Sequence, residues 1–238
     1  MTDDLKDIMP RGLSRHDRPL SGLTVLVVED SRFASEAMRL LCLRSGARIR
    51  RADCLHSARR HLCVYRPQVS VIDLGLPDGM GDTLISELVR STPRVPVVLG
   101  CSGDDGARVR ALDAGADGFL AKPVTSLAAF QQAVMSHLPS DGLPAMRPVS
   151  DERVQPDRFA FRDDMVHAAE MLAADADART LDYLAQFLAG VARDAHDRTL
   201  ETAADGLALC HRNAAAKVGA RAKIASLVQA RIAASGPV

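Results

Sequence analysis

Val71-Ile72-Asp73-Leu74 decides the fold class, because an apolar run there ends in a single carboxylate. In three other segments an apolar run is likewise followed by a polar side chain: Val27-Val28-Glu29-Asp30, Leu99-Gly100-Cys101-Ser102-Gly103 and Leu120-Ala121-Lys122-Pro123. If these runs are parallel strands of one sheet, their polar groups gather at its carboxyl edge. Open α/β sheets bind ligands at that edge.

The residues between these segments support this geometry. Apolar residues at helical spacing alternate with short apolar runs, and Gly46 is a suitable helix C-terminal stop. Strands are predicted at 23–28, 48–52, 69–74, 95–99 and 118–120, and helices at 31–45, 55–62, 84–89, 107–112 and 127–138. Five alternating strand–helix pairs predict an α/β domain with a parallel sheet covered on both faces.

The polar groups at the predicted edge are three carboxylates and one ammonium. Two like charges about 4 Å apart repel by roughly 1 kcal/mol in water and by about 4 kcal/mol at an effective dielectric of 20. Such a cluster takes up protons or recruits a cation. Mg²⁺ suits a site of few carboxylates that leaves positions for water and phosphate oxygens.

A carboxylate can also attack a phosphoryl group and form an aspartyl phosphate. Asp73 is the best candidate, with Glu29 and Asp30 as metal ligands, Lys122 paired with the phosphoryl oxygens and the Ser102 hydroxyl as a further partner. Each motif alone has an ordinary explanation: Glu29-Asp30-Ser31 can be a helix N-cap, and Asp73 a turn residue. Their joint occurrence, in order along an alternating pattern, is far more specific.

Residues 22–138 resemble the receiver domain of two-component response regulators. The matching motifs are Val-Leu-Val-Val-Glu-Asp-Ser at 25–31, Val-Ile-Asp-Leu-Gly-Leu-Pro-Asp-Gly-Met-Gly at 71–81 and Ala-Gly-Ala-Asp-Gly-Phe-Leu-Ala-Lys-Pro at 114–123. The resemblance implies a flavodoxin-like, doubly wound sheet with strand order 2-1-3-4-5, and a cis bond between Lys122 and Pro123. It also implies phosphorylation of Asp73 by a histidine kinase or a phosphotransfer protein.

Further roles follow from the same resemblance. It implies Mg²⁺ bound by Glu29, Asp30, Asp73 and the backbone carbonyl of Gly75, and it places Phe119 at the switch aromatic of the family. Because no second catalytic constellation appears in the sequence, we expect no separate enzymatic activity beyond self-catalysed phosphoryl transfer and dephosphorylation.

The chain departs from the family pattern at the end of the fourth strand, where Ser or Thr is expected. Counting back from the lysine reaches Gly100, counting along the strand from Pro96 reaches Cys101, and the small pair Ser102-Gly103 resembles the usual residues. Ser102 is favoured. If Gly100 or Cys101 holds the position, the usual coupling of the hydroxyl to Phe119 is weak or altered.

The rest of the chain divides into a tail, a linker and a second domain. Residues 1–21 are polar and predict a loose tail, and residues 139–156 are rich in Pro and Gly and predict a linker. Residues 157–238 are rich in alanine and predict a small all-α bundle. Its three helices are expected at about 157–174, 176–210 with a break near Gly206, and 213–234.

Composition favours a cytoplasmic protein that does not cross a membrane. Charge is balanced, with 30 basic and 30 acidic residues, so a strong bulk field for nucleic acid is absent. No apolar stretch is long enough to span a bilayer, and residues 1–21 lack a signal-peptide core. The odd number of cysteines, without CxxC pairing, predicts reduced thiols: Cys42, Cys54, Cys63, Cys101 and Cys210.

Three outputs compete for the C-terminal region. The favoured one is a helical module that binds a protein partner or dimerises, because a small bundle with wide apolar faces buries little core alone. The second is a DNA-binding transcription regulator using the basic residues of the last helix: Arg212, Lys217, Arg221, Lys223 and Arg231. A solvated basic face explains these residues better.

The third output is a phosphorelay intermediate with a histidine-phosphotransfer-like C-terminal domain. His167 and His196 both lie in predicted helices. His196-Asp197-Arg198-Thr199 resembles the residues that follow a kinase histidine, but its threonine is one position early, and the Lys-Gly of a phosphotransfer signature is missing. Ordinary solvated histidines are favoured.

Overall fold

The computed structural model describes residues 18–104, 106–138, 152–174, 177–209 and 214–234. The strands are β1 (Thr24–Val28), β2 (Arg48–Ala52), β3 (Val69–Asp73), β4 (Gly75–Leu76), β5 (Gly79–Met80), β6 (Val97–Ser102) and β7 (Gly118–Ala121). The N-terminal helices are α1 (Arg32–Ser45), α2 (Leu55–Val64), α3 (Gly81–Arg90), α4 (Ala107–Asp113) and α5 (Leu127–Met135). The C-terminal helices are α6 (Arg158–Ala173), α7 (Ala178–Asp194), α8 (Arg198–Leu209) and α9 (Ala214–Ala234).

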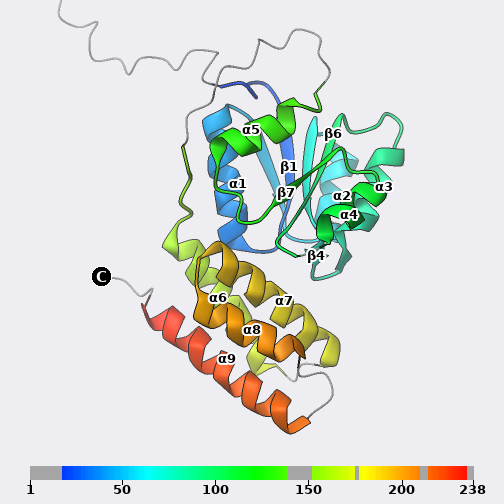
Figure 1. Ribbon diagram of the computed structural model, residues 1–238. Coiled ribbons are helices and arrows are strands. Elements are labelled where there is room, and N and C mark those ends of the chain that lie inside the picture. The colour runs from blue at the N-terminus through cyan, green and yellow to red at the C-terminus, as the bar shows by residue number, and fades with distance from the viewer. Residues whose placement is uncertain (1–17, 105, 139–151, 175–176, 210–213, 235–238) are drawn as a thin grey trace, which may run out of the picture.

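Five parallel strands form one sheet in the order β2-β1-β3-β6-β7. This order confirms the flavodoxin-like fold, and the Lys122–Pro123 peptide bond is cis, as the resemblance implied. The helical bundle lies beyond one end of this sheet, next to β4 (Figure 1).

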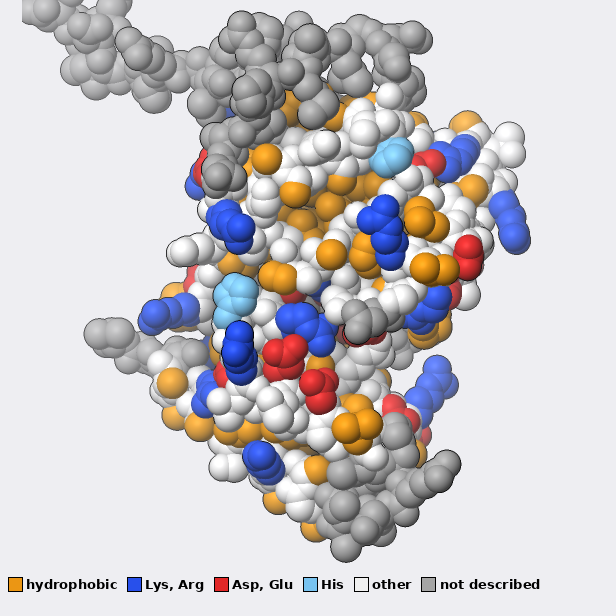
Figure 2. All heavy atoms as spheres, viewed as in Figure 1, with side chains coloured by type: hydrophobic (Ala, Val, Ile, Leu, Met, Phe, Trp, Pro, Cys, Tyr) orange, Lys and Arg blue, Asp and Glu red, His pale blue; other side chains and the backbone are white. Residues whose placement is uncertain are grey.

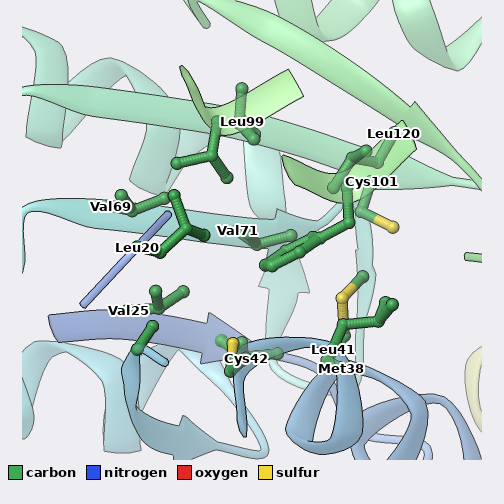
Figure 3. Close-up of a cluster of buried hydrophobic side chains, with 14 of the residues drawn as sticks. Leu20, Val25, Met38, Leu41, Cys42, Val69, Val71, Leu99, Cys101 and Leu120 are labelled. Atoms are coloured by element: carbon green, nitrogen blue, oxygen red, sulfur yellow. The ribbon is translucent and has the colours of Figure 1, made fainter. Parts of the chain in front are cut away.

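The central strands β1, β3 and β6 are buried on both faces because helices cover both. Alternate residues such as Val25, Val71 and Leu99 pack with α1 and α5, as Figure 3 shows for α1. The intervening residues, including Leu26 and Ile72, pack with α2, α3 and α4. The period-two alternation therefore divides the core into two layers, one on each side of the sheet.

A two-stranded hairpin, β4–β5, follows β3 and was not predicted. Pro77 and Asp78 make its turn, and Gly79, the first residue of β5, has φ 151°. The chain then passes so close to Asp73 that a Cβ on Gly81 would lie 1.9 Å from the Asp73 carbonyl oxygen. Glycine is required at position 81, and this close return starts α3 directly behind Asp73.

The predicted strand at 95–99 was placed too early. β6 runs from Val97 to Ser102 because the small residues Gly100 and Cys101 still pair with Phe119 and Leu120 of β7. The strand therefore carries Ser102 itself to the sheet edge.

The C-terminal region has four described helices instead of the three predicted, and the break lies at 195–197, not near Gly206. His196 adopts a left-handed conformation, with φ 56°, that ends α7. The Asp197 carboxylate then accepts a hydrogen bond from the Leu200 amide at the start of α8. Gly206 lies inside α8, where helix packing overrides its low helix propensity.

The boundaries of the predicted tail and linker contain ordered residues. Leu20 is fully buried in the core of the first domain, and Val154 is 4% exposed in the same core. The amide of Val154 donates to the Thr125 carbonyl, and Ser126 and Arg153 form a β-bridge. The remainder of both segments, 1–17 and 139–151, lies outside the described residues.

Among the described helices, none combines the length and the apolar character needed to cross a membrane.

Candidate functional site

The carboxylates predicted to cluster do so at the carboxyl edge of the sheet. Glu29 and Asp30 follow β1 directly, and Asp73 is the last residue of β3, the neighbouring strand. Each offers a carboxylate oxygen, and the three oxygens lie within 4.8 Å of one another. This donor set fits Mg²⁺, which takes one or two protein carboxylates and completes its shell with water and phosphate oxygens.

Lys122 reaches the same point from the end of β7. Its ammonium lies 2.7 Å from Glu29 Oε2 and 3.1 Å from Asp73 Oδ2. Burial alone would lower the pKa of Lys122, but the charges of Asp73 and Glu29 raise it well above its usual value. The ammonium therefore stays charged and holds two of the carboxylates.

One ammonium does not neutralise three carboxylates. Burial raises the pKa of Glu29 well above its usual value, with a smaller contribution from the charge of Asp73. Burial, followed by the charge of Asp73, raises the pKa of Asp30 to about 6. Keeping all three buried carboxylates charged is therefore unfavourable, and a bound divalent cation would offset this cost.

Of the three residues considered for the hydroxyl position, only Ser102 lines the cleft over the carboxylates. Cys101 points into the hydrophobic core (Figure 3), where burial raises the pKa of its thiol. A Cβ on Gly100 would lie 2.6 Å from the Ala111 side chain, so this position faces α4. The Ser102 hydroxyl accepts a hydrogen bond from the Asp104 amide at 3.2 Å.

The remaining predicted residues lie near this cleft. Gly75, on β4, lines it beside Asp73. Phe119, on β7, is half-buried and packs against the core layer of α2, α3 and α4. It pairs with Gly100, two positions before Ser102.

Sequence reasoning missed the second wall of the cleft, which comes from helix α7. The α7 residues that line it are Gln186, Phe187, Gly190, Val191, Arg193 and Asp194. The hydroxyl of Tyr183, one turn earlier, donates a hydrogen bond to Asp30 Oδ2. Tyr183, Gly190 and Asp194 recur at helical spacing beside the apolar face of α7, and this second stripe was the available signal.

The bundle also contacts the start of α1, next to the predicted metal ligands Glu29 and Asp30. Asp164 of α6, only 1% exposed, accepts hydrogen bonds from the Ser31 hydroxyl at 2.8 Å, the Arg32 amide at 2.7 Å and the Phe33 amide at 3.0 Å. A carboxylate at a helix N-terminus is favourable because the first amides lack partners within the helix. Burial nevertheless raises the pKa of Asp164.

Two further contacts hold the loop after β6. The Gln186 amide nitrogen donates to Asp104 Oδ2 at 3.1 Å, and Arg193 Nη1 donates to the Gly103 carbonyl at 3.1 Å. Asp104 and Gly103 immediately follow Ser102. The bundle therefore contacts four segments around the cleft: the end of β1, the start of α1, strand β4 and the β6–α4 loop.

The two histidines lie elsewhere. His167 is exposed on α6, and its ring meets Phe187 edge to face. His196 is exposed, but it lies in the turn between α7 and α8, so its predicted helical position was wrong.

Comparison with known proteins gives a family match in the first domain. Residues 25–134 match the family described as the response regulator receiver domain. The KDP operon transcriptional regulatory protein KdpE of Escherichia coli K12 is 37% identical over 100 residues, covering 42% of this chain and 44% of the relative. The virulence transcriptional regulatory protein PhoP of Salmonella typhimurium is 30% identical over 116 residues, covering 48% and 52%. The chain spans about half the length of the curated relatives it matches.

Solved structures match over the same half of the chain. A putative response regulator from Chloroflexus aurantiacus J-10-fl is 25% identical, with a TM-score of 0.44, over 48% of this chain and 98% of that one. The receiver domain of the sensor histidine kinase PA1611 from Pseudomonas aeruginosa PAO1, solved with magnesium in its active-site cleft, is 24% identical, with a TM-score of 0.45, over 49% and 98%.

Proposed function

Residues 25–134 belong to the response regulator receiver family, and from this we propose that Asp73 accepts a phosphoryl group from a histidine kinase or a phosphotransfer protein. The proposal rests on one observation: the carboxylates of Glu29, Asp30 and Asp73 lie together with the Lys122 ammonium at one edge of the sheet. The protein then acts as a two-component response regulator.

The proposed transfer assigns a role to each residue. An oxygen of Asp73 forms a bond to phosphorus as the phosphorus–nitrogen bond of a phosphohistidine breaks, and the imidazole leaves with a proton. Lys122, already bound to Asp73, pairs with the transferred oxygens, and the Ser102 hydroxyl donates to one of them. Glu29, Asp30, Asp73 and the Gly75 carbonyl would hold Mg²⁺, which supplies positive charge opposite the phosphoryl oxygens.

We propose no separate catalytic activity for the chain beyond this transfer and its reversal by water. Phosphorylation instead changes what the helical module binds. Movement of Ser102 toward the phosphoryl group, coupled to Phe119, would carry the change to the rest of the domain. A cytoplasmic location fits these roles and the unpaired cysteines Cys42, Cys54, Cys63 and Cys101; Cys210 lies outside the described residues.

DNA binding is the second candidate, suggested by the names of KdpE and PhoP. Their similarity covers only the receiver half of this chain. In α9, Arg221 donates to the Leu172 carbonyl and Arg231 binds the Asp197 carboxylate, so both hold the bundle together. On the face in Figure 2, the described Lys and Arg side chains are scattered among acidic ones. A protein partner, or a second copy of the chain, is therefore the favoured target.

A phosphorelay role for the bundle is less favoured. His167 is exposed on α6, but it is not followed by the Lys-Gly of a phosphotransfer signature, and His196 lies in a turn and not on a helix face.

The phosphoacceptor is tested by incubating the chain with acetyl phosphate and Mg²⁺ and measuring intact mass. One added phosphate is expected in wild type, and none in Asp73→Asn. Labelling that survives this substitution unchanged would reject Asp73 as the acceptor. In parallel, Asp30→Ala should weaken Mg²⁺ binding strongly, and equal affinity would place the metal elsewhere.

A further inference from the structure

Helix α7 covers the cleft in which the proposed phosphoacceptor lies. Asp73 is 7% exposed, with Gln186, Phe187 and Val191 of α7 among the residues that line the cleft above it. A phosphohistidine carried on a partner protein must bring its phosphorus to an Asp73 oxygen. In this arrangement the partner would have to reach Asp73 past the side chains of α7.

The contact made by Tyr183 falls on a predicted metal ligand. Asp30 Oδ2 accepts the Tyr183 hydroxyl, and Asp30 Oδ1 accepts the Ser31 amide at 3.0 Å. Mg²⁺ requires a near-octahedral shell and keeps several waters. The Tyr183 hydroxyl and a cation would therefore compete for the same carboxylate of Asp30.

The bundle can leave the receiver without opening a hydrophobic core. The buried cluster of α6–α9 contains only residues of the bundle, and the two receiver clusters contain only receiver residues and Val154. The described contacts across the boundary are polar ones made by Asp164, Tyr183, Gln186 and Arg193, together with one edge-to-face contact between Phe33 and Phe161. Water can replace the partners of such groups at little cost.

The chain connection limits the motion that is available. Residues 152–154 stay attached to the receiver through the bridge at Arg153 and the buried Val154. Helix α6 begins at Arg158, only four residues after Val154. Release would therefore be a rotation of the bundle about residues 155–157.

We propose that the α6–α7 face is an internal inhibitor of the receiver, docked on the cleft in the unphosphorylated chain and displaced when Mg²⁺ and a phosphoryl group enter. The inference rests on the proposed function and names its regulation. Because linkage is reciprocal for binding equilibria, a docked bundle weakens Mg²⁺ binding, and Mg²⁺ weakens docking by the same factor. A docked bundle also slows phosphorylation because it covers Asp73.

Tyr183→Phe in the full chain tests this competition, because it removes the hydroxyl and keeps the ring. Mg²⁺ affinity measured by calorimetry should rise about tenfold, the range expected for loss of a hydrogen bond to a charged group. Labelling by acetyl phosphate should also be faster in Tyr183→Phe than in wild type. Tyr65→Phe is the matched control, since Tyr65 is the only other tyrosine and its hydroxyl, on the receiver, has no partner among the described residues.

A second measurement follows the docking itself. Hydrogen exchange of the α7 residues that face the cleft should quicken when Mg²⁺ and beryllofluoride are added to wild type, while exchange at the α7–α8 packing surface stays slow. Equal Mg²⁺ affinity in wild type and Tyr183→Phe, together with unchanged exchange in α7, would overturn the inference and leave Asp73 as the acceptor. Absence of Mg²⁺ binding in every variant would overturn both proposals.

Discussion

Asp164→Ala is the sharpest perturbation of the contact between bundle and receiver. The carboxylate is almost fully buried and accepts three hydrogen bonds from Ser31, Arg32 and Phe33, with donor–acceptor distances of 2.7–3.0 Å. Truncation removes all three and leaves two amides at the start of α1 without these partners. The Ser31 hydroxyl still caps α1 through the Ala34 amide, so the helix itself should persist.

The magnitude follows from the balance of these contacts. A hydrogen bond to a charged group contributes about 1.5–3 kcal/mol. Burying the carboxylate opposes this, as its raised pKa shows. We expect a net loss of about 3 kcal/mol of docking free energy.

Urea denaturation followed by circular dichroism measures this loss. With a denaturant slope of about 3 kcal/mol per molar, the transition that couples the two domains should shift by about 1 M. Asp163→Ala is the matched control. Its ion pair with Arg32 joins side chains that are 49% and 70% exposed, so its removal should cost less than about 0.5 kcal/mol. Equal effects of the two substitutions would refute the assignment of Asp164 as the main docking contact.

Three further predictions concern the cleft and the assembly. Burial raises the pKa of Asp194 from 3.8 to about 6, so the folded state binds more protons than the unfolded state in that window. Without Mg²⁺, the free energy of unfolding should therefore fall as pH rises from about 4 to about 6, by at most about 1.4 kcal/mol per pH unit. Asp194→Asn should flatten this slope in denaturation series at several pH values, and identical slopes would reject the assignment. Ser102→Ala should keep phosphorylation detectable but reduce the shift of the Phe119 amide resonance on adding beryllofluoride, and an undiminished shift would indicate a switch that bypasses Ser102. Light scattering of the full chain should show a dimer through the C-terminal helices, and a monomer in both phosphorylation states would remove that prediction.

The receiver fold was predictable because its signals are local. Each strand combines a short apolar run with a polar end, and helical spacing separates one strand from the next. The cluster of Glu29, Asp30, Asp73 and Lys122 was equally accessible, since parallel strands bring their carboxyl ends to one edge. The bounds of β6 could not be predicted from the sequence, because Gly100 and Cys101 have weak strand preference. Pairing with β3 and β7 holds these two residues in the strand.

The docked bundle could not be predicted from local patterns. Asp164 and Tyr183 meet Ser31 and Asp30 across 133 and 153 residues of sequence, and no periodicity encodes such a pairing. The turn at 195–197 was missed for a related reason. Its left-handed histidine is stabilised by the packing of α7 on α8 and by the ion pair of Asp197 with Arg231 of α9.

A crystal structure of the full chain with Mg²⁺ and beryllofluoride tests the central claim most directly. The account predicts the beryllofluoride group on an oxygen of Asp73, within reach of Lys122 and Ser102. It also predicts the cation on Asp30 and Asp73, with the Tyr183 hydroxyl withdrawn from Asp30. Beryllofluoride and cation bound at another site, or an Asp73 left unmodified at saturating concentrations, would contradict it.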